Sequence, residues 1–315
     1  MLFLLVTFPA LVTATEEETN TPIEKMALYK KTEALTNIPW YYLAAIDKYE
    51  ANIQKETASE GVVSITVPED KWYGYGNPGT NTVPEWISLF NGIGQDGDGD
   101  GLAVINNDED ILFSIAFWIS KTGLAKDDIK IALWKYYQRE LTVQTIMNIA
   151  KVYKNFGTIE LYENDFPLPL NYNYSYRNTW GDARGFGGRR IHEGTDIFAN
   201  YGVPVRSTTY GVVEMKGWNR FGGWRIGIRD IRNTYHYYAH LNGFKEGLKV
   251  GDVVKPGDVI GSVGATGYGP PGTSGKFPPH LHYGMYKDNG YSEWSFDPYP
   301  YLKRWEREAK NRAKK

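Results

Sequence analysis

The sequence of 315 residues contains no cysteine. This absence excludes disulfide bonds, thiol catalysis and zinc sites ligated by cysteine, and it leaves the cellular compartment open. The sequence also lacks an excess of charge of either sign, because 35 Lys and Arg residues oppose 37 Asp and Glu residues, for a formal net charge of −2. Proteins that bind nucleic acids are usually distinctly basic, so we expect no nucleic-acid partner.

The N-terminal segment is apolar but too short to span a membrane. It ends near Ala14 and contains Pro9, whereas a spanning helix needs about 20 apolar residues. Its length and the small residues around Ala14 predict that residues 1–15 form a signal peptide or a membrane anchor, although the usual basic n-region is missing. A buried N-terminal helix is the alternative. We therefore expect an exported, extracytoplasmic protein, in the cell wall or anchored to the membrane facing the wall.

The two halves of the chain have different textures, and the length suits two domains. Apolar residues recur at helical spacing in segments 38–49, 108–120, 127–137 and 143–156. After residue 172, short β-branched and aromatic runs alternate with glycines, which is typical of strands and turns. The sequence thus predicts an α+β multidomain protein. Its parts are an all-α domain (16–158), a linker (159–172), an antiparallel all-β domain (173–301) and a charged tail (302–315) that forms a solvated helix.

All five histidines lie in the β-rich half. His280 and His282 follow two prolines and flank Leu281. On a strand, both imidazoles would face one way and Leu281 would face the core. His192 precedes Asp196 by four residues, in a glycine-containing loop that leads into a strand. Two imidazoles and one carboxylate around an open position are typical of a catalytic zinc site, although any single histidine could instead be a buried, hydrogen-bonded one.

Three ordered motifs resemble the signature of the lysostaphin-type zinc metallopeptidases. They are His192-x-x-x-Asp196, Tyr238-Ala-His240-Leu and His280-Leu-His282, and the resemblance covers about residues 173–300. It implies that zinc is bound by His192, Asp196 and His282. It also implies that the catalytic pair, which orients water and stabilises the transition state, is formed by His240 and His280.

Three further residues of this half receive weaker assignments. Tyr238, in the second motif, is predicted to contact the substrate. Arg184 ends a Trp-Gly-Asp-Ala-Arg segment that resembles one common just upstream of the first motif, and it could bind a substrate carboxylate or simply pack at the surface. His236 matches no position of the family and is given no role.

An acidic loop in the N-terminal half resembles the beginning of an EF-hand. Carboxylates at Asp96, Asp98 and Asp100 occupy positions 1, 3 and 5, and a glycine occupies position 6. Position 12 is Asn107 rather than the bidentate glutamate of the standard loop, so Asp108 or Asp110 would have to replace it. The pattern predicts a calcium site, with a plain acidic turn as the alternative.

The helical half distantly resembles the lytic transglycosylases of the lysozyme-like superfamily. The resembling pieces are segments 38–46, 96–112 and 132–136, together with Glu50, which stands where that family has its general acid. However, Tyr137 replaces the usual asparagine, and no serine follows Glu50. Glycan binding or scaffolding is therefore the alternative to glycan cleavage.

The combination of the two halves resembles the sporulation-associated L-alanyl–D-glutamate endopeptidases of endospore-forming bacteria. It predicts a zinc-dependent endopeptidase that hydrolyses L-Ala–D-Glu bonds in the stem peptides of bacterial peptidoglycan. Two alternatives remain. One is a lytic transglycosylase, or a two-activity wall hydrolase, that uses Glu50. The other is a non-catalytic wall-binding protein. The sequence does not specify an oligomeric state.

Overall fold

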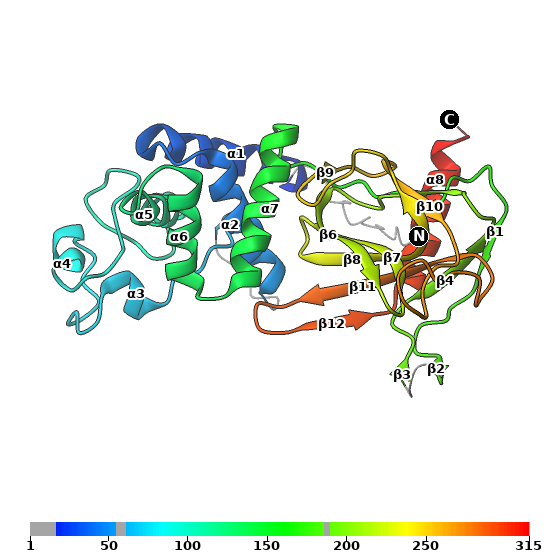
Figure 1. Cartoon of the computed structure of the whole chain (residues 1–315). Coiled ribbons are helices and arrows are strands. Elements are labelled where there is room, and N and C mark those ends of the chain that lie inside the picture. Colours follow the sequence, from blue (N-terminus) through cyan, green and yellow to red (C-terminus); the bar gives the residue numbers. More distant parts are fainter. Residues whose placement is uncertain (1–16, 55–60, 186–189, 315) are drawn as a thin grey trace, which may run out of the picture.

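The computed structural model describes residues 17–54, 61–185 and 190–314. The predicted signal peptide or anchor, residues 1–15, lies outside this part of the chain. Within the described ranges, no helix combines the length and the apolar character that crossing a bilayer requires. Figure 1 shows helices gathered at one end of the molecule and a twisted sheet at the other, with α7 between them.

The helical unit contains the first seven helices of the described chain. They are α1 (Glu17–Thr36), α2 (Trp40–Ile53), α3 (Glu69–Tyr73), α4 (Pro84–Leu89), α5 (Asp108–Ser120), α6 (Lys126–Tyr137) and α7 (Glu140–Phe156). The four segments with helical periodicity correspond to α2, α5, α6 and α7. Local signals fix their ends: the Asn107 side chain caps α5 by accepting from two backbone N–H groups, and Gly157 ends α7 in the left-handed conformation. The lysozyme-like identity of this unit stays a prediction.

The sheet unit is antiparallel, as the sequence predicts. Its ten-stranded sheet has the order β1-β4-β11-β8-β7-β6-β9, with β12 beside β11 and β10 beside both β5 and β8. A two-stranded ribbon, β2 and β3, stands apart. The strands are β1 (Tyr174–Tyr176), β2 (Ala183–Arg184), β3 (Arg190–Ile191), β4 (Thr195–Ala199), β5 (Pro204–Arg206), β6 (Gly211–Asn219), β7 (Gly223–Asp230), β8 (Thr234–Phe244), β9 (Val253–Val254), β10 (Val259–Val263), β11 (His280–Asp288) and β12 (Glu293–Phe296).

The C-terminal helix α8 (Tyr299–Arg312) corrects the expectation of a solvated tail. Residues 302–315 do include a charged helix, but one of its faces is buried against the sheet. Leu302 and Trp305 are 0% and 2% exposed and belong to the core of the sheet unit. The sequence of α8 is rich in charged residues, but it also contains an apolar stripe at helical spacing.

The connection between the units, residues 159–172, is packed rather than free. Phe166 and Leu168 are buried in the sheet core, and Leu161 is buried in the helical core. The helical core also includes Val212 and Ile231 from the sheet unit. The two units therefore share apolar packing, which holds the helices in a defined place beside the sheet.

Candidate metal centre and catalytic cleft

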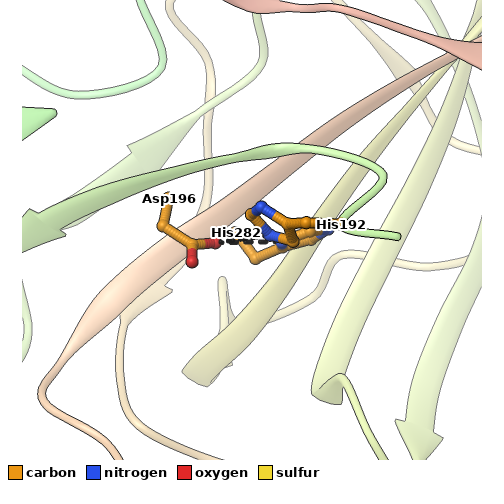
Figure 2. Close-up of side chains that lie close together, drawn as sticks. All are labelled: His192, Asp196 and His282. Carbon is orange, nitrogen blue, oxygen red and sulfur yellow. Dashed lines mark hydrogen bonds and ion pairs between the residues drawn. The ribbon is translucent and has the colours of Figure 1, made fainter. Parts of the chain in front are cut away.

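Strand pairing brings the zinc-ligand candidates together. β4 and β11 are antiparallel neighbours, and His282 lies directly opposite Asp196. His192 stands in the loop before β4, and Figure 2 shows its ring beside that of His282, near the Asp196 carboxylate. His192 Nε2 is 2.8 Å from His282 Nδ1 and 3.1 Å from Asp196 Oδ1, and His282 Nδ1 is 3.0 Å from the same oxygen.

These distances fit a tetrahedral zinc site. Ligand atoms about 2.1 Å from a shared Zn²⁺ lie roughly 3.4 Å from one another, and the three donor atoms need to separate by only a few tenths of an ångström to reach this spacing. The donors also have suitable chemistry. Burial alone would raise the pKa of Asp196, but the close imidazoles of His192 and His282 outweigh it and hold that pKa far below its usual range. Burial lowers the pKa of His282, which favours the neutral imidazole that binds a metal.

The tautomer of His192 is set by its second ring nitrogen. His192 Nδ1 is 2.7 Å from the backbone carbonyl oxygen of Thr179. A carbonyl can only accept a hydrogen bond, so Nδ1 bears the proton. Nε2 therefore directs its lone pair toward the position that a metal would share with the other two ligand atoms. Thr179 also helps to position β4, because its hydroxyl accepts the Asp196 backbone N–H at 3.1 Å. No pattern in the sequence marks Thr179.

Gly194 is required by the close approach of the His192 loop to β11. A Cβ atom at this position would lie 2.6 Å from His282 Cε1 and 2.7 Å from both His282 Nε2 and the Tyr283 carbonyl oxygen. Side chains do not tolerate such distances. The glycine therefore lets the loop pass against the imidazole of a ligand candidate.

His240 reaches the same cleft through an irregularity in β8. Its φ of +61° is rare for a residue other than glycine. Tyr238 and Leu241, three residues apart, both face the core, which regular alternation does not permit. The positive φ at His240 inserts one extra step and turns its ring toward His280, with ring centroids 4.6 Å apart.

Both members of the predicted catalytic pair present Nε2 to the cleft. His240 Nδ1 donates to the Thr266 carbonyl and His280 Nδ1 donates to the Pro278 carbonyl, each at 2.7 Å. Burial, followed by the neighbouring His280 and His282, lowers the pKa of His240 to about 3. His240 is therefore neutral near pH 7, and its Nε2 can accept a proton. Leu281, between the two histidines of β11, is buried in the core as expected.

The cleft around these histidines has a volume of about 240 Å³. Its walls include the aromatic side chains of Phe221, Tyr237, Tyr268 and Phe277, together with charged groups of Arg190 and Glu193. None of these wall residues belongs to the site predicted from the sequence. Tyr237 could have been found from the alternation of β8, because it lies one residue from the core-facing Tyr238.

Tyr238 does not contact the substrate, which corrects the sequence prediction. It is 0% exposed, and its hydroxyl hydrogen-bonds with Thr208 in the core. Regular alternation would place Tyr238 on the same face as His240, and the irregularity at His240 removes that relation. Arg184 does line the cleft, but its guanidinium donates to Asp196 Oδ2 at 2.6 Å. It thereby holds the Asp196 carboxylate in place and leaves its Oδ1 facing the histidines.

His236 has a structural role. It is 1% exposed, and its two ring nitrogens lie 3.1 Å from Asp230 Oδ2 and 2.6 Å from the Tyr283 hydroxyl. Burial alone would raise the pKa of Asp230, but the hydrogen bond from His236 lowers it. The pair fixes the turn between β7 and β8 from the core side.

Calcium binding at the acidic loop stays a prediction. The carboxylates that approach one another belong to Asp96, Asp98 and Asp110, so Asp100 stands outside the group. These groups already accept hydrogen bonds: Asp96 from the backbone N–H groups of Gly99 and Gly101, and Asp110 from that of Gly97. The contacts are those of an acidic turn that caps itself.

Glu50 lies near the end of α2, in the helical unit rather than in the cleft. Burial raises its pKa to about 7, although the hydrogen bond from the Tyr137 hydroxyl, at 2.7 Å, lowers it. This pKa would suit a general acid. However, the side chain is buried in the packing of α2 against the α6–α7 turn, and glycan cleavage through Glu50 stays a prediction.

Comparisons with known proteins agree with this geometry. The family model described as peptidase family M23 matches residues 190–295. The chain is 62% identical over 289 residues to the L-Ala--D-Glu endopeptidase of Bacillus subtilis (strain 168), and the match covers 90% of this chain and 89% of that protein.

The chain belongs to peptidase family M23. It is also 36% identical over 115 residues to lysostaphin of Staphylococcus simulans, which covers 36% of this chain and 22% of that protein. Among solved structures, the catalytic domain of that lysostaphin matches at 33% identity with a TM-score of 0.33, covering 42% of this chain and 93% of the domain. The family match includes all three histidine motifs, and M23 membership makes the chain a metallopeptidase.

Proposed function

We propose that this M23 peptidase hydrolyses L-Ala–D-Glu bonds in the stem peptides of bacterial peptidoglycan and that it requires zinc. The observation that carries the proposal is the convergence of His192, Asp196 and His282 beside the Nε2 atoms of His240 and His280, in an open cleft. The bond is proposed from the relative named for it, because that likeness extends through both the helical unit and the sheet unit.

Zinc, when held by His192, Asp196 and His282, supplies Lewis-acid activation of the water and the scissile carbonyl. The chain itself supplies the proton transfers. His240 and His280 both direct Nε2 into the cleft, and the neutral His240 can accept the proton of the attacking water. Once protonated, that ring becomes a donor beside the developing oxyanion or the leaving amine. The carbonyls of Thr266 and Pro278 accept from the Nδ1–H groups and keep both rings in place.

Two further proposals follow from the substrate. Peptidoglycan lies outside the cytoplasmic membrane, so we propose that the protein acts there. Residues 1–15, as a signal peptide or membrane anchor, would direct its export. We also propose a role in sporulation, which is supported by the likeness to the L-Ala--D-Glu endopeptidase of Bacillus subtilis and by the resemblance of the two halves to sporulation-associated endopeptidases. Neither proposal changes the chemistry of the cleft.

Digestion of purified peptidoglycan with and without a zinc chelator tests the function. Mass spectrometry should find new D-Glu amino termini that disappear when the chelator is present. Anhydro-sugar ends that persist with the chelator would instead identify the helical unit as the enzyme. In that case, the Glu50→Gln variant should stop their formation, and a product pattern unchanged by this variant would exclude Glu50.

A further inference from the structure

The sheet has a second pocket on the face opposite the catalytic cleft. Side chains alternate along β8 and β11, so Tyr286 and His282 face the cleft whereas Met285 and Lys287 face the other way. On β8, His236 pairs with Met285 and also faces this second pocket. The pocket has a volume of about 490 Å³. It is closed by α2 of the helical unit and by α8, and the two strands run between these helices in Figure 1.

The walls of this pocket are basic. They include Lys48 of α2, Arg232 of the β7–β8 turn, Lys287 of β11 and Arg304 of α8. The carboxylate on the wall, Asp230, is already engaged by His236 and by the backbone N–H groups of Arg232 and Thr234. Four cations from four elements thus line one cavity, and its carboxylate is already engaged in hydrogen bonds.

Lys48 is the strongest indication of a missing partner. It is half-buried, and its ammonium group makes no hydrogen bond or ion pair within the described chain. Burial, followed by the neighbouring Arg232, lowers its pKa. Arg232 donates to the side-chain oxygen of Asn164 and to the carbonyl of Tyr162, so it too lacks a carboxylate partner within hydrogen-bond distance. Charges that are partly removed from water in proteins are often paired, and an anion in the pocket would pair these.

Aromatic side chains form the rest of the wall. Trp294 and Phe296 of β12 and Tyr301 of α8 line the pocket, and Trp294 is 43% exposed. Such rings contact the aliphatic part of a ligand, while guanidinium and ammonium groups bind its acidic groups. The combination suits a small peptide with several free carboxylates, because in such a peptide the carboxylates alternate with short apolar side chains.

We propose that this pocket is a non-catalytic binding site for the free carboxylates of a peptidoglycan stem peptide. The proposal rests on the proposed function for the identity of the peptide. A second stem peptide held here would keep the enzyme on the wall while the cleft on the opposite face cuts another one. The contact would add affinity for the polymer without adding to the chemistry.

The test measures binding of a synthetic stem tripeptide in its free-acid form to the zinc-loaded His240→Ala protein, by isothermal titration calorimetry. Two peptides should bind per chain, one in the cleft and one in the pocket. Adding Lys48→Gln and Lys287→Gln, whose side chains have no partners to lose, should weaken the pocket site at least about tenfold. The control pair Lys245→Gln and Lys255→Gln removes the same charge from exposed positions elsewhere and should change nothing.

Several results would overturn the proposal. One is a single binding event that the Lys48→Gln/Lys287→Gln pair leaves unchanged, and another is equal binding of a fully amidated peptide. Tighter binding of an oligo(glycerol phosphate) at the same lysines would assign the pocket to a phosphate polymer instead. If that pair fails to fold, Arg304→Gln tests the same site from α8. Loss of zinc-dependent cleavage alone would refute the proposed function, whereas pocket binding is read without turnover.

Discussion

At the scale of single residues, the site is organised by backbone carbonyls. His192, His240 and His280 each direct Nδ1 to a carbonyl oxygen at 2.7 Å. The same contact therefore places one Nε2 lone pair toward the metal position and two toward the reacting groups. What distinguishes a ligand from a proton carrier here is position in the cleft, because all three rings have the same tautomer.

This division of roles predicts different losses for two substitutions. His282→Ala should lose both zinc and activity, because it removes one of three ligand atoms. His240→Ala should keep zinc and lose about 10²-fold or more in kcat, because it removes a proton carrier. Metal content by atomic spectroscopy and cleavage of a stem peptide check both. Full zinc content in His282→Ala would refute the ligand assignment.

Gly194 offers a prediction about packing near the metal. Gly194→Ala would place a methyl group 2.6 Å from the His282 ring, so the loop or the ring must move. We expect zinc affinity to fall by roughly 10- to 100-fold, as for other changes that displace a ligand. Competition with a chromogenic chelator measures this. Gly243→Ala, where a new Cβ meets nothing within 4 Å, is the control. Equal affinities in the two variants would contradict the role of Gly194.

Glu50 predicts a pH-dependent stability. Its pKa is about 7 in the folded chain and about 4.5 when unfolded. Between these values the unfolded chain loses a proton that the folded chain keeps, so stability falls as pH rises and the full cost is present above pH 7. Glu50→Gln should remove this cost, roughly 3 kcal/mol. Denaturant unfolding should show a more stable variant at pH 8 and equal stabilities at pH 4. A variant less stable at pH 8 would be the contrary result.

At the scale of elements, the periodicity of the sequence predicted the regular helices and strands. It failed where the backbone departs from regular geometry. The four helices and the outward pairing of His280 with His282 follow from spacing alone. Tyr238 was misplaced because the positive φ at His240 breaks alternation, and no residue type in Tyr-Ala-His-Leu signals that break. The prediction of a solvated tail was wrong for another reason: Leu302, Trp305 and Ala309 form a narrow apolar stripe among many charged residues.

The burial of α8 predicts that Trp305 is important for stability. Trp305 is 2% exposed and contacts the rings of His236, Tyr283 and Tyr301. Trp305→Ala should cost about 3–5 kcal/mol of unfolding free energy, as for other buried aromatic residues. Trp294→Ala, at 43% exposure, is the size-matched control and should cost far less. Urea unfolding followed by circular dichroism measures both. A loss below 1 kcal/mol for Trp305→Ala would mean that α8 is detached in solution.

At the scale of the whole molecule, the helical unit and the sheet unit are joined by polar contacts as well as by a shared core. Asn52 donates to the Ile231 carbonyl at 2.9 Å, and Asn148 donates to Glu214 at 2.8 Å. These contacts could not be predicted from the sequence, because they pair residues far apart in the chain and depend on how the units dock. The docking also creates the basic pocket, since α2 provides one of its walls.

A bidentate ion pair also joins the two units, and it supports a prediction about the stability of the whole fold. Arg139, between α6 and α7, donates to both carboxylate oxygens of Asp288 at the end of β11, at 2.9 and 2.6 Å. Asp288 is 0% exposed, so Arg139→Met would leave a buried carboxylate without its cation. We expect a loss of about 3–5 kcal/mol.

Guanidinium unfolding, followed by tryptophan fluorescence and circular dichroism together, measures this loss. Because the units share a core, both signals should change in one transition at lower denaturant. Lys130→Met, on the exposed side of α6, is the control for removing a cation. If Arg139→Met instead separates the two signals, the units unfold independently, and the ion pair rather than the apolar contact holds them together. A loss below 1 kcal/mol would assign the docking to the apolar contact.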